Sequence, residues 1–144
     1  MGKSTIISQA AQMLRERDNF LILTHVNPDG DTLGSGFALA RVLRLMGKSA
    51  NVINSEEFPL RYLFLFESYK PQDFEPLTII AVDIADVQLL GDKLSVYKDS
   101  VDLCIDHHIS NTFYAMQTLL DSKAAATCEV VYGLIHELGV EIDN

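Results

Sequence analysis

Histidine and aspartate gather in three short stretches of this 144-residue chain. The first stretch, "HVNPDGDT", contains His25, Asp29 and Asp31, and the third, "DHH", covers residues 106–108. Between them, Asp83 ends the apolar run "IIAVD". Carboxylate and imidazole groups without a neighbouring thiolate suit Mn²⁺ or a similar divalent cation better than structural zinc. These residue types predict a metal site, provided that the fold brings the three stretches together.

Each stretch follows an apolar segment that has the character of a buried β-strand. "FLIL" precedes the first stretch, "LTIIAV" precedes Asp83, and "VDLCI" precedes "DHH". In open α/β sheets, ligands bind outside the carboxyl ends of the strands, which lie along one edge. We therefore expect His25, Asp83 and His107, with their neighbours, at the same edge of one sheet.

The order of strand-like and helix-like segments defines the expected fold. It predicts a single α/β domain with a mainly parallel, five-stranded, Rossmann-like sheet and helices on both faces. The expected strands are residues 20–25, 50–55, 77–83, 101–106 and 113–120. The expected helices are residues 4–17, 32–48, 59–67, 87–90 and 122–139, with Gly47 and Gly139 as C-terminal caps. Gly34 and Gly36 keep the start of the 32–48 helix slim, and its free N–H groups would favour a phosphate.

Each stretch alone has a simpler structural explanation. "NPDGD" is a good turn sequence, in which Asp31 could cap the following helix. His25 could be a buried histidine with satisfied hydrogen bonds, Asp83 could cap a turn, and "DHH" is short enough to occur by chance. The metal hypothesis is favoured because it explains all three stretches at once, at one predicted edge of the sheet.

The composition limits the partners of the chain. Asp and Glu number 20 against 11 Lys and Arg, which gives a formal net charge of −9. This charge disfavours long duplex nucleic acid, which is bound largely through its phosphates, but suits a site that gains positive charge from metal ions. No apolar stretch approaches the ~20 residues of a membrane helix and no secretory leader is evident, so we expect a cytoplasmic protein without membrane association. Cys104 and Cys128 are expected to be reduced core thiols.

"HVNPDGDTLGS", the strand-final Asp83 and "DHHIS" resemble, in order, the successive motifs of the DHH phosphoesterases. That family includes RecJ-like exonucleases, oligoribonuclease/pAp phosphatases (nano-RNases), cyclic-dinucleotide phosphodiesterases and family II inorganic pyrophosphatases. "NPDGDT", the helix ahead of the first strand and "AAATCEVVYGLI" are most similar to the oligoribonuclease/pAp phosphatase branch. The resemblance implies a metal-dependent phosphoesterase that hydrolyses short oligonucleotides or pAp.

The resemblance also implies a ligand set of two Mn²⁺ ions, with Mg²⁺ or Co²⁺ as the alternative cations. By position, His25, Asp29 and Asp83 would hold one ion. Asp31, Asp83 and His107 would hold the second, so that Asp83 bridges the pair. Water activated between the two ions would attack phosphorus in line.

Two further residues take catalytic roles by the same resemblance. His108 would contact the substrate phosphate or protonate the leaving oxygen. Asp106 would orient the histidines without contacting the metal ions itself. Family members usually supply a fourth metal-ligating Asp after the last helix, and a smaller C-terminal substrate-binding domain. This chain stops at "GVEIDN", so we expect residues 1–144 to be a DHH domain truncated at its C-terminal end, without that second domain and with doubtful activity on its own.

Two alternatives to this function remain open. The same metal pair could hydrolyse pyrophosphate or polyphosphate, because substrate choice would depend on the missing domain. A non-catalytic nucleotide-binding module is the other alternative, although it has no physical need for all six groups from His25 to His108. The sequence does not specify the natural substrate, the direction of exonuclease action or the oligomeric state.

Overall fold

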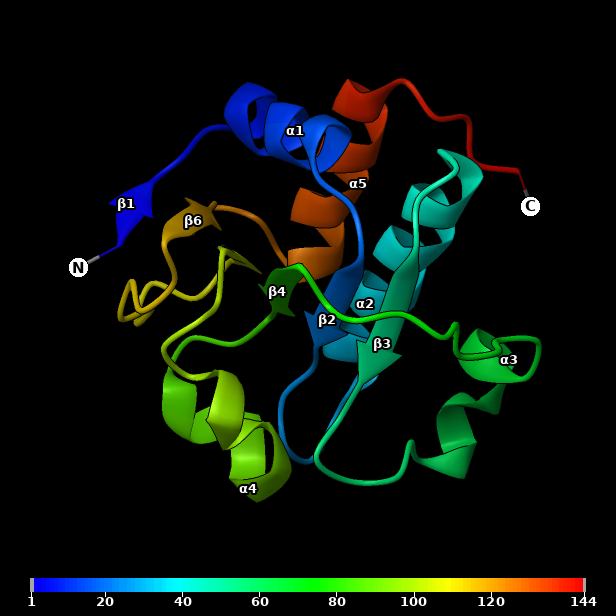
Figure 1. Ribbon diagram of the computed structural model, residues 1–144. Coiled ribbons are helices and arrows are strands. Elements are labelled where there is room, and N and C mark those ends of the chain that lie inside the picture. The colour runs from blue at the N-terminus through cyan, green and yellow to red at the C-terminus, as the bar shows by residue number, and fades with distance from the viewer. Residues whose placement is uncertain (1, 144) are drawn as a thin grey trace.

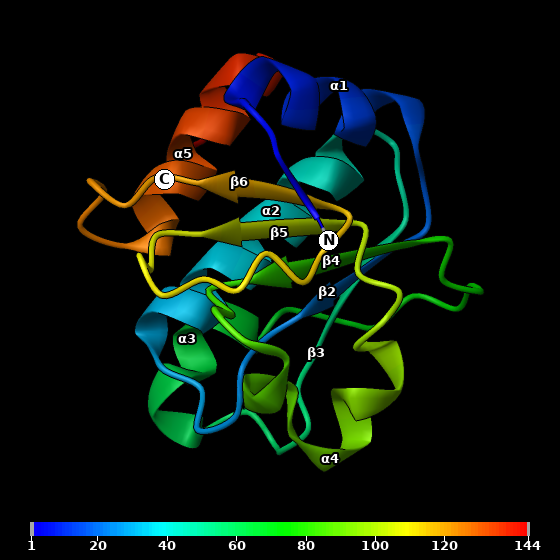
Figure 2. The same cartoon turned by 90° about the vertical axis from the view of Figure 1, so that its left-hand side faces the viewer.

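The computed structural model describes residues 2–143, and its centre is a six-stranded sheet in the order β1-β6-β5-β4-β2-β3. Every pairing between neighbouring strands of this sheet is parallel, and the arrows of β4, β5 and β6 point the same way in Figure 2. The strands are β1 (Lys3–Ser4), β2 (Phe20–Leu23), β3 (Ala50–Ile53), β4 (Thr78–Val82), β5 (Leu103–Asp106) and β6 (Gln117–Leu120).

Helices cover both faces of the sheet, but unequally. The helical elements are α1 (Ile7–Glu16), α2 (Gly30–Leu45), η1 (Leu60–Tyr62), α3 (Leu63–Phe66), η2 (Val87–Leu90), α4 (Gly91–Leu94), η3 (Ser95–Tyr97) and α5 (Thr127–Leu138). The long helices α1, α2 and α5 pack on one face, and the short elements η2, α4 and η3 lie on the other (Figures 1 and 2). Among residues 2–143, no helix combines the length and the apolar character that a membrane crossing requires.

Burial on both faces explains the apolar strands that precede the histidine and aspartate stretches. Every residue of β2, β4 and β5 is buried. Phe20 and Ile22 belong to the core beneath α1, α2 and α5, whereas Leu21 and Leu23 belong to the core beneath η2 and α4. An uninterrupted apolar run is what a parallel strand covered by helices on both sides requires.

The topological switch point of the sheet, where the order of the strands reverses, lies between β2 and β4. From β2 the chain continues outward to β3 at one edge, and from β4 it proceeds through β5 to β6 on the other side. Ligand sites in open α/β sheets form at such a switch, outside the carboxyl ends of the two strands. The segments that follow β2 and β4 begin with Thr24 and Asp83, so the first two stretches flank this position.

Helix α2 lies close against the sheet because of a glycine. A Cβ atom on Gly36 would lie 3.2 Å from side-chain atoms of both Thr24 and Val52, which is tighter than ordinary packing. The helix therefore approaches β2 and β3 more closely than a larger residue would allow. At its other end, Gly47 has the positive φ of 81° expected for a C-terminal cap, and Gly139 ends α5 in the left-handed region.

Several expectations from the sequence are wrong in detail, including the bounds of the first helix, which begins at Ile7 rather than at residue 4. The sheet has six strands rather than five, because Lys3 and Ser4 pair with β6. The sequence does not indicate this strand, because two exposed polar residues show no alternation or apolar run. The last helix begins at Thr127 rather than at residue 122, because the Asp121 side chain accepts a hydrogen bond from the N–H of Lys123 in a turn. Cys104 is buried as expected, but Cys128 is exposed rather than in the core.

Candidate metal centre

The loop between β2 and α2 is a capped turn as well as a source of candidate ligands. Asn27 has a positive φ of 48°, a conformation that Asn adopts more readily than most residues. Asp29 is the N-cap of α2, and its Oδ1 accepts hydrogen bonds from the N–H groups of Asp31 (3.1 Å) and Thr32 (3.0 Å). The cap of α2 is thus Asp29 rather than Asp31, and the Asp31 side chain reaches α5 instead.

His25 lies between two carboxylates. Its Nδ1 is 2.6 Å from the carbonyl oxygen of Val26, so the backbone fixes one ring nitrogen. Its Nε2 is 3.5 Å from Oδ1 of Asp29 and 3.5 Å from Oδ2 of Asp83. An imidazole with one nitrogen held by the main chain and the other directed at carboxylates has the arrangement of a metal-ligating histidine.

Asp83 occupies the centre of the site. It follows β4 directly, is 3% exposed, and has a φ of 61°, in the left-handed region. Its Oδ2 faces Nε2 of His25 at 3.5 Å, and its Oδ1 faces Nε2 of His107 at 3.7 Å. The two oxygens of one buried carboxylate are therefore turned toward two different histidines.

The "DHH" stretch is organised by the buried Asp106. Its Oδ1 accepts hydrogen bonds from the N–H of His107 (2.9 Å) and from Nδ1 of His108 (2.7 Å). Its Oδ2 accepts a hydrogen bond of 2.7 Å from the side-chain amide of Asn111, a residue to which the sequence alone assigns no role. Asn111 in turn accepts a hydrogen bond from the N–H of Phe113 (2.8 Å), so the loop after β5 and the carboxylate are held together.

Asp31 connects α2 to α5. Its two oxygens accept hydrogen bonds from the N–H groups of Thr127 (3.0 Å) and Cys128 (2.8 Å), and Oδ2 lies 3.6 Å from Nε2 of His107. Thr127 also donates from its hydroxyl to Oδ1 of Asp83 at 2.8 Å. Sequence reasoning missed Thr127, because its partner is 44 residues away and no short motif joins them.

The expected residues do come together. His25, Asp29 and Asp83 form one group whose ligand atoms all lie within 4.8 Å of one another, and Asp83, His107 and His108 form a second. Asp83 belongs to both groups. The second group contains His108 where the family resemblance implied Asp31. His108 approaches Asp83 through Nδ1 (3.6 Å), a nitrogen that already bonds to Asp106 (2.7 Å).

The site has excess negative charge. Within residues 2–143, the ion-pair contacts within 4.0 Å of Asp29, Asp31, Asp83 and Asp106 involve histidines only, and no Lys or Arg. Burial opposes charge on His25, but its hydrogen bonds with Asp83 and Val26 and the charge of Asp29 raise its pKa to about 9. Burial likewise opposes charge on His108, while the hydrogen bond with Asp106 raises its pKa. Oxygen and imidazole donors around uncompensated carboxylates fit a divalent cation such as Mn²⁺.

The N-terminus of α2 is a weaker phosphate site than the sequence suggested. Two of its free N–H groups, those of Asp31 and Thr32, are occupied by the Asp29 side chain. The N–H of Leu33 bonds to the Asp29 carbonyl. Few helix N–H groups are therefore left to hold an anion there.

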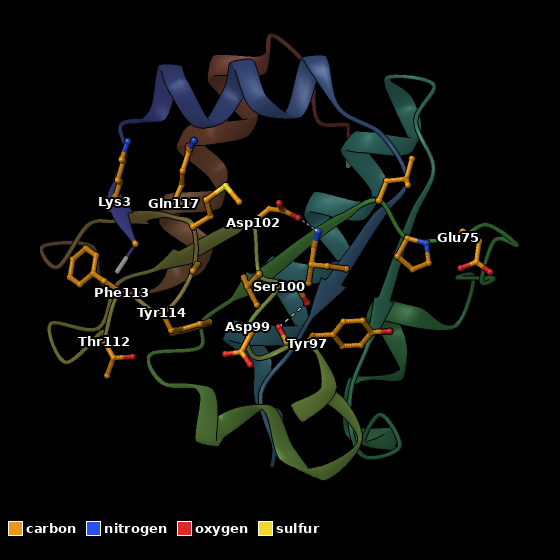
Figure 3. A pocket seen from close by; sticks show the side chains of 17 residues that line it. Lys3, Glu75, Tyr97, Asp99, Ser100, Asp102, Thr112, Phe113, Tyr114 and Gln117 are labelled. Carbon is orange, nitrogen blue, oxygen red and sulfur yellow. Dashed lines mark hydrogen bonds between the residues drawn. The ribbon is translucent and has the colours of Figure 1, made fainter.

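A large cavity of about 1160 Å³ lies at the opposite, amino edge of the sheet. Figure 3 shows its lining, which includes Lys3 and Gln117 from the starts of β1 and β6, and Asp102, which directly precedes β5. None of the three histidine and aspartate stretches lines it. The half-buried Asp102 is already paired, because it bonds to Arg17 (2.9 Å) and accepts a hydrogen bond from the N–H of Ile79 (2.8 Å).

Comparison with known proteins identifies the family of the chain. The model of the DHH family, N-terminal domain, matches residues 19–144, which is most of the chain. The chain belongs to the DHH family.

Named relatives point to one part of that family. The chain is 36% identical over 123 residues to "Bifunctional oligoribonuclease and PAP phosphatase NrnA" of Thermus thermophilus, and 27% identical over 123 residues to the protein of that name in Bacillus subtilis. Both matches cover 83% of this chain. A solved structure, an "exopolyphosphatase-related protein" from Bacteroides fragilis, is similar with a TM-score of 0.77, 26% identity and 92% of this chain covered. The chain spans only 37%, 39% and 43% of the length of these three proteins.

Proposed function

We propose that the chain carries the metal centre of a Mn²⁺-dependent phosphoesterase that hydrolyses short oligonucleotides or pAp. The observation that carries this proposal is the position of Asp83, whose two oxygens face His25 and His107 and which belongs to both candidate ligand groups. The names of the Thermus thermophilus and Bacillus subtilis relatives support the substrate class.

The residues fit two cations that share Asp83. His25, Asp29 and Asp83 would hold the first. Asp31 and His107 would complete the second, because Asp31 Oδ2 lies 3.6 Å from His107 Nε2 and because the Nδ1 of His108 is already bonded to Asp106. When bound, such a pair supplies Lewis acidity toward phosphoryl oxygens and lowers the pKa of water.

The remaining side chains would bind substrate and move a proton. With Nδ1 held by Asp106 at 2.7 Å, His108 has Nε2 free to contact the substrate phosphate and to donate a proton to the leaving oxygen. Asp106 favours the charged imidazole, because a buried carboxylate at hydrogen-bond distance stabilises the positive ring. Asn111 fixes the carboxylate of Asp106 from the other side.

A second candidate is hydrolysis of pyrophosphate or polyphosphate by the same metal pair. The similarity to the exopolyphosphatase-related protein from Bacteroides fragilis supports it. A non-catalytic nucleotide-binding role is less consistent with this site, because binding a nucleotide does not require a buried carboxylate between two histidines.

The experiment that tests the proposal is a substrate panel with Mn²⁺ titration. The protein is offered a dinucleotide, pAp and pyrophosphate in parallel, with and without EDTA, and Mn²⁺ binding is measured separately by calorimetry. We expect two Mn²⁺ ions to bind, and EDTA-sensitive product from the dinucleotide or pAp. Product from pyrophosphate alone would favour the second candidate. A protein that binds no Mn²⁺ would contradict the metal centre itself.

A further inference from the structure

The first turn of α5 holds two carboxylates of the candidate metal centre at once. The N–H groups of Thr127 and Cys128 bond to the two oxygens of Asp31, at 3.0 and 2.8 Å. The hydroxyl of Thr127 bonds to Oδ1 of Asp83 at 2.8 Å. Asp31 belongs to α2 and Asp83 follows β4, so this single turn ties together candidate ligands from two separate segments.

Helix α5 has no cap from its own sequence. Ala126 is the N-cap residue and makes no side-chain hydrogen bond to the helix. The first N–H groups of a helix have no partner within it, and they attract negative charge. Asp31, 96 residues before Thr127 in the chain, supplies the missing acceptor. Burial opposes ionisation of Asp31, but the hydrogen bonds from the N–H groups of Cys128 and Thr127 lower its pKa. The orientation of Asp31 and the start of α5 therefore depend on each other.

The Thr127 hydroxyl lies 2.8 Å from the Asp83 carboxylate, closer than the histidine nitrogens, which lie 3.5–3.7 Å from it. Thr127 is fully buried and Asp83 is 3% exposed, so water does not compete for their hydrogen bond. A hydroxyl that donates to an ionised, buried carboxylate forms one of the stronger hydrogen bonds in proteins. It occupies one lone pair of Oδ1, the oxygen that faces His107, and so fixes the rotation of the Asp83 side chain.

We propose that Thr127 is a positioning residue for the metal centre: its hydroxyl holds Asp83, and the turn that it begins holds Asp31, in the orientation that binds two cations. This inference rests on the proposed function. Thr127 itself touches neither cation nor substrate, and it acts only through the two carboxylates.

The test compares three substitutions at one position. Thr127→Val keeps the shape of the side chain and removes the hydroxyl, Thr127→Ser keeps the hydroxyl and removes the methyl group, and Thr127→Ala removes both. Mn²⁺ affinity is measured by calorimetry, and folding is checked by thermal unfolding in EDTA. We expect Thr127→Val and Thr127→Ala to weaken Mn²⁺ binding about 10–100-fold, the usual cost of losing a hydrogen-bond partner behind a metal ligand. Thr127→Ser should bind Mn²⁺ as the wild type does.

Asp83→Ala, measured alongside, separates failure of this inference from failure of the proposed function. If Asp83→Ala binds Mn²⁺ like the wild type, the metal centre itself is wrong. If Asp83→Ala loses binding while folded Thr127→Val or Thr127→Ala retains wild-type affinity, only the role of Thr127 is overturned. Equal weakening in Thr127→Ser and Thr127→Val would also overturn it, because methyl packing rather than the hydroxyl would then matter.

Discussion

At the amino edge of the sheet Asp102 pairs with an arginine, whereas at the carboxyl edge the ion-pair partners of Asp29, Asp31 and Asp83 are, among residues 2–143, histidines alone. Asp102 pairs with Arg17 at 2.9 Å and accepts a hydrogen bond from the N–H of Ile79, beside the cavity of Figure 3. Both edges contain buried or half-buried carboxylates. The difference is that Asp102 is paired with an arginine, whereas the acids of the carboxyl edge have, within residues 2–143, no Lys or Arg in ion-pair contact.

This difference separates an acid that supports the fold from acids that are candidate metal ligands. A carboxylate paired with arginine and a backbone N–H gains nothing from a further cation, because its charge is already compensated. Carboxylates that share histidines gain strongly from one, because the histidines can exchange a proton for a metal. The large cavity lies beside Asp102 and not beside the candidate metal ligands.

The largest expected effect comes from removing the shared ligand. Asp83→Ala should lower Mn²⁺ affinity by more than the about 100-fold that loss of an outer hydrogen-bond partner can cost, because both candidate ligand groups contain Asp83. Calorimetric titration of Mn²⁺ into the purified variant measures this. Asp102→Ala is the matched control and should bind Mn²⁺ normally. Equal affinities for the two variants would remove the distinction between the edges.

The next effect is the pH dependence of the metal-free protein. The pKa of His25 rises from 6.5 to about 9 on folding, so the folded state binds an extra proton between these values, and stability falls as pH rises through this window. At about 1.4 kcal/mol per pKa unit, the loss is on the order of 3 kcal/mol. Urea unfolding in EDTA at pH 6, 7.5 and 9 measures it.

His25→Gln should reduce the slope of that pH profile, and part of the slope should remain because the pKa of His108 is raised as well. His136→Gln, which changes an exposed histidine of α5, should leave it as in the wild type. A wild-type profile that is flat or that rises between pH 6.5 and 9 would contradict the electrostatic description of the carboxyl edge.

The smallest effect concerns the amino edge. Asp102→Ala removes an ion pair and an acceptor for the N–H of Ile79, and should lower the free energy of unfolding by about 2 kcal/mol, as loss of a hydrogen bond to a charged group does. Denaturant unfolding in EDTA measures this change. Addition of Mn²⁺ should stabilise this variant as much as it stabilises the wild type. Unchanged stability would show that Asp102 does not support the fold.

The main features of the fold and the site could be predicted where local pattern and topology agree. "FLIL", "TIIAV" and "LCID" read as strands because both of their faces are buried, and the ends of parallel strands must share an edge. The strand β1 could not be predicted, because two exposed polar residues acquire strand geometry only by pairing with β6. Thr127 could not be predicted for a related reason: its role exists only through a contact with Asp83 across 44 residues.

The left-handed backbone of Asp83 has a consequence for engineering. For a residue with a Cβ atom this conformation costs about 1 kcal/mol or more, and glycine adopts it without that cost. Glycine at position 83 would remove this backbone cost, but it would also remove the carboxylate that Thr127 and the histidines contact, so the local gain would be offset by the loss of those interactions. Any effort to make this domain more robust has to leave this one unfavourable residue in place, and to seek its gains elsewhere in the chain.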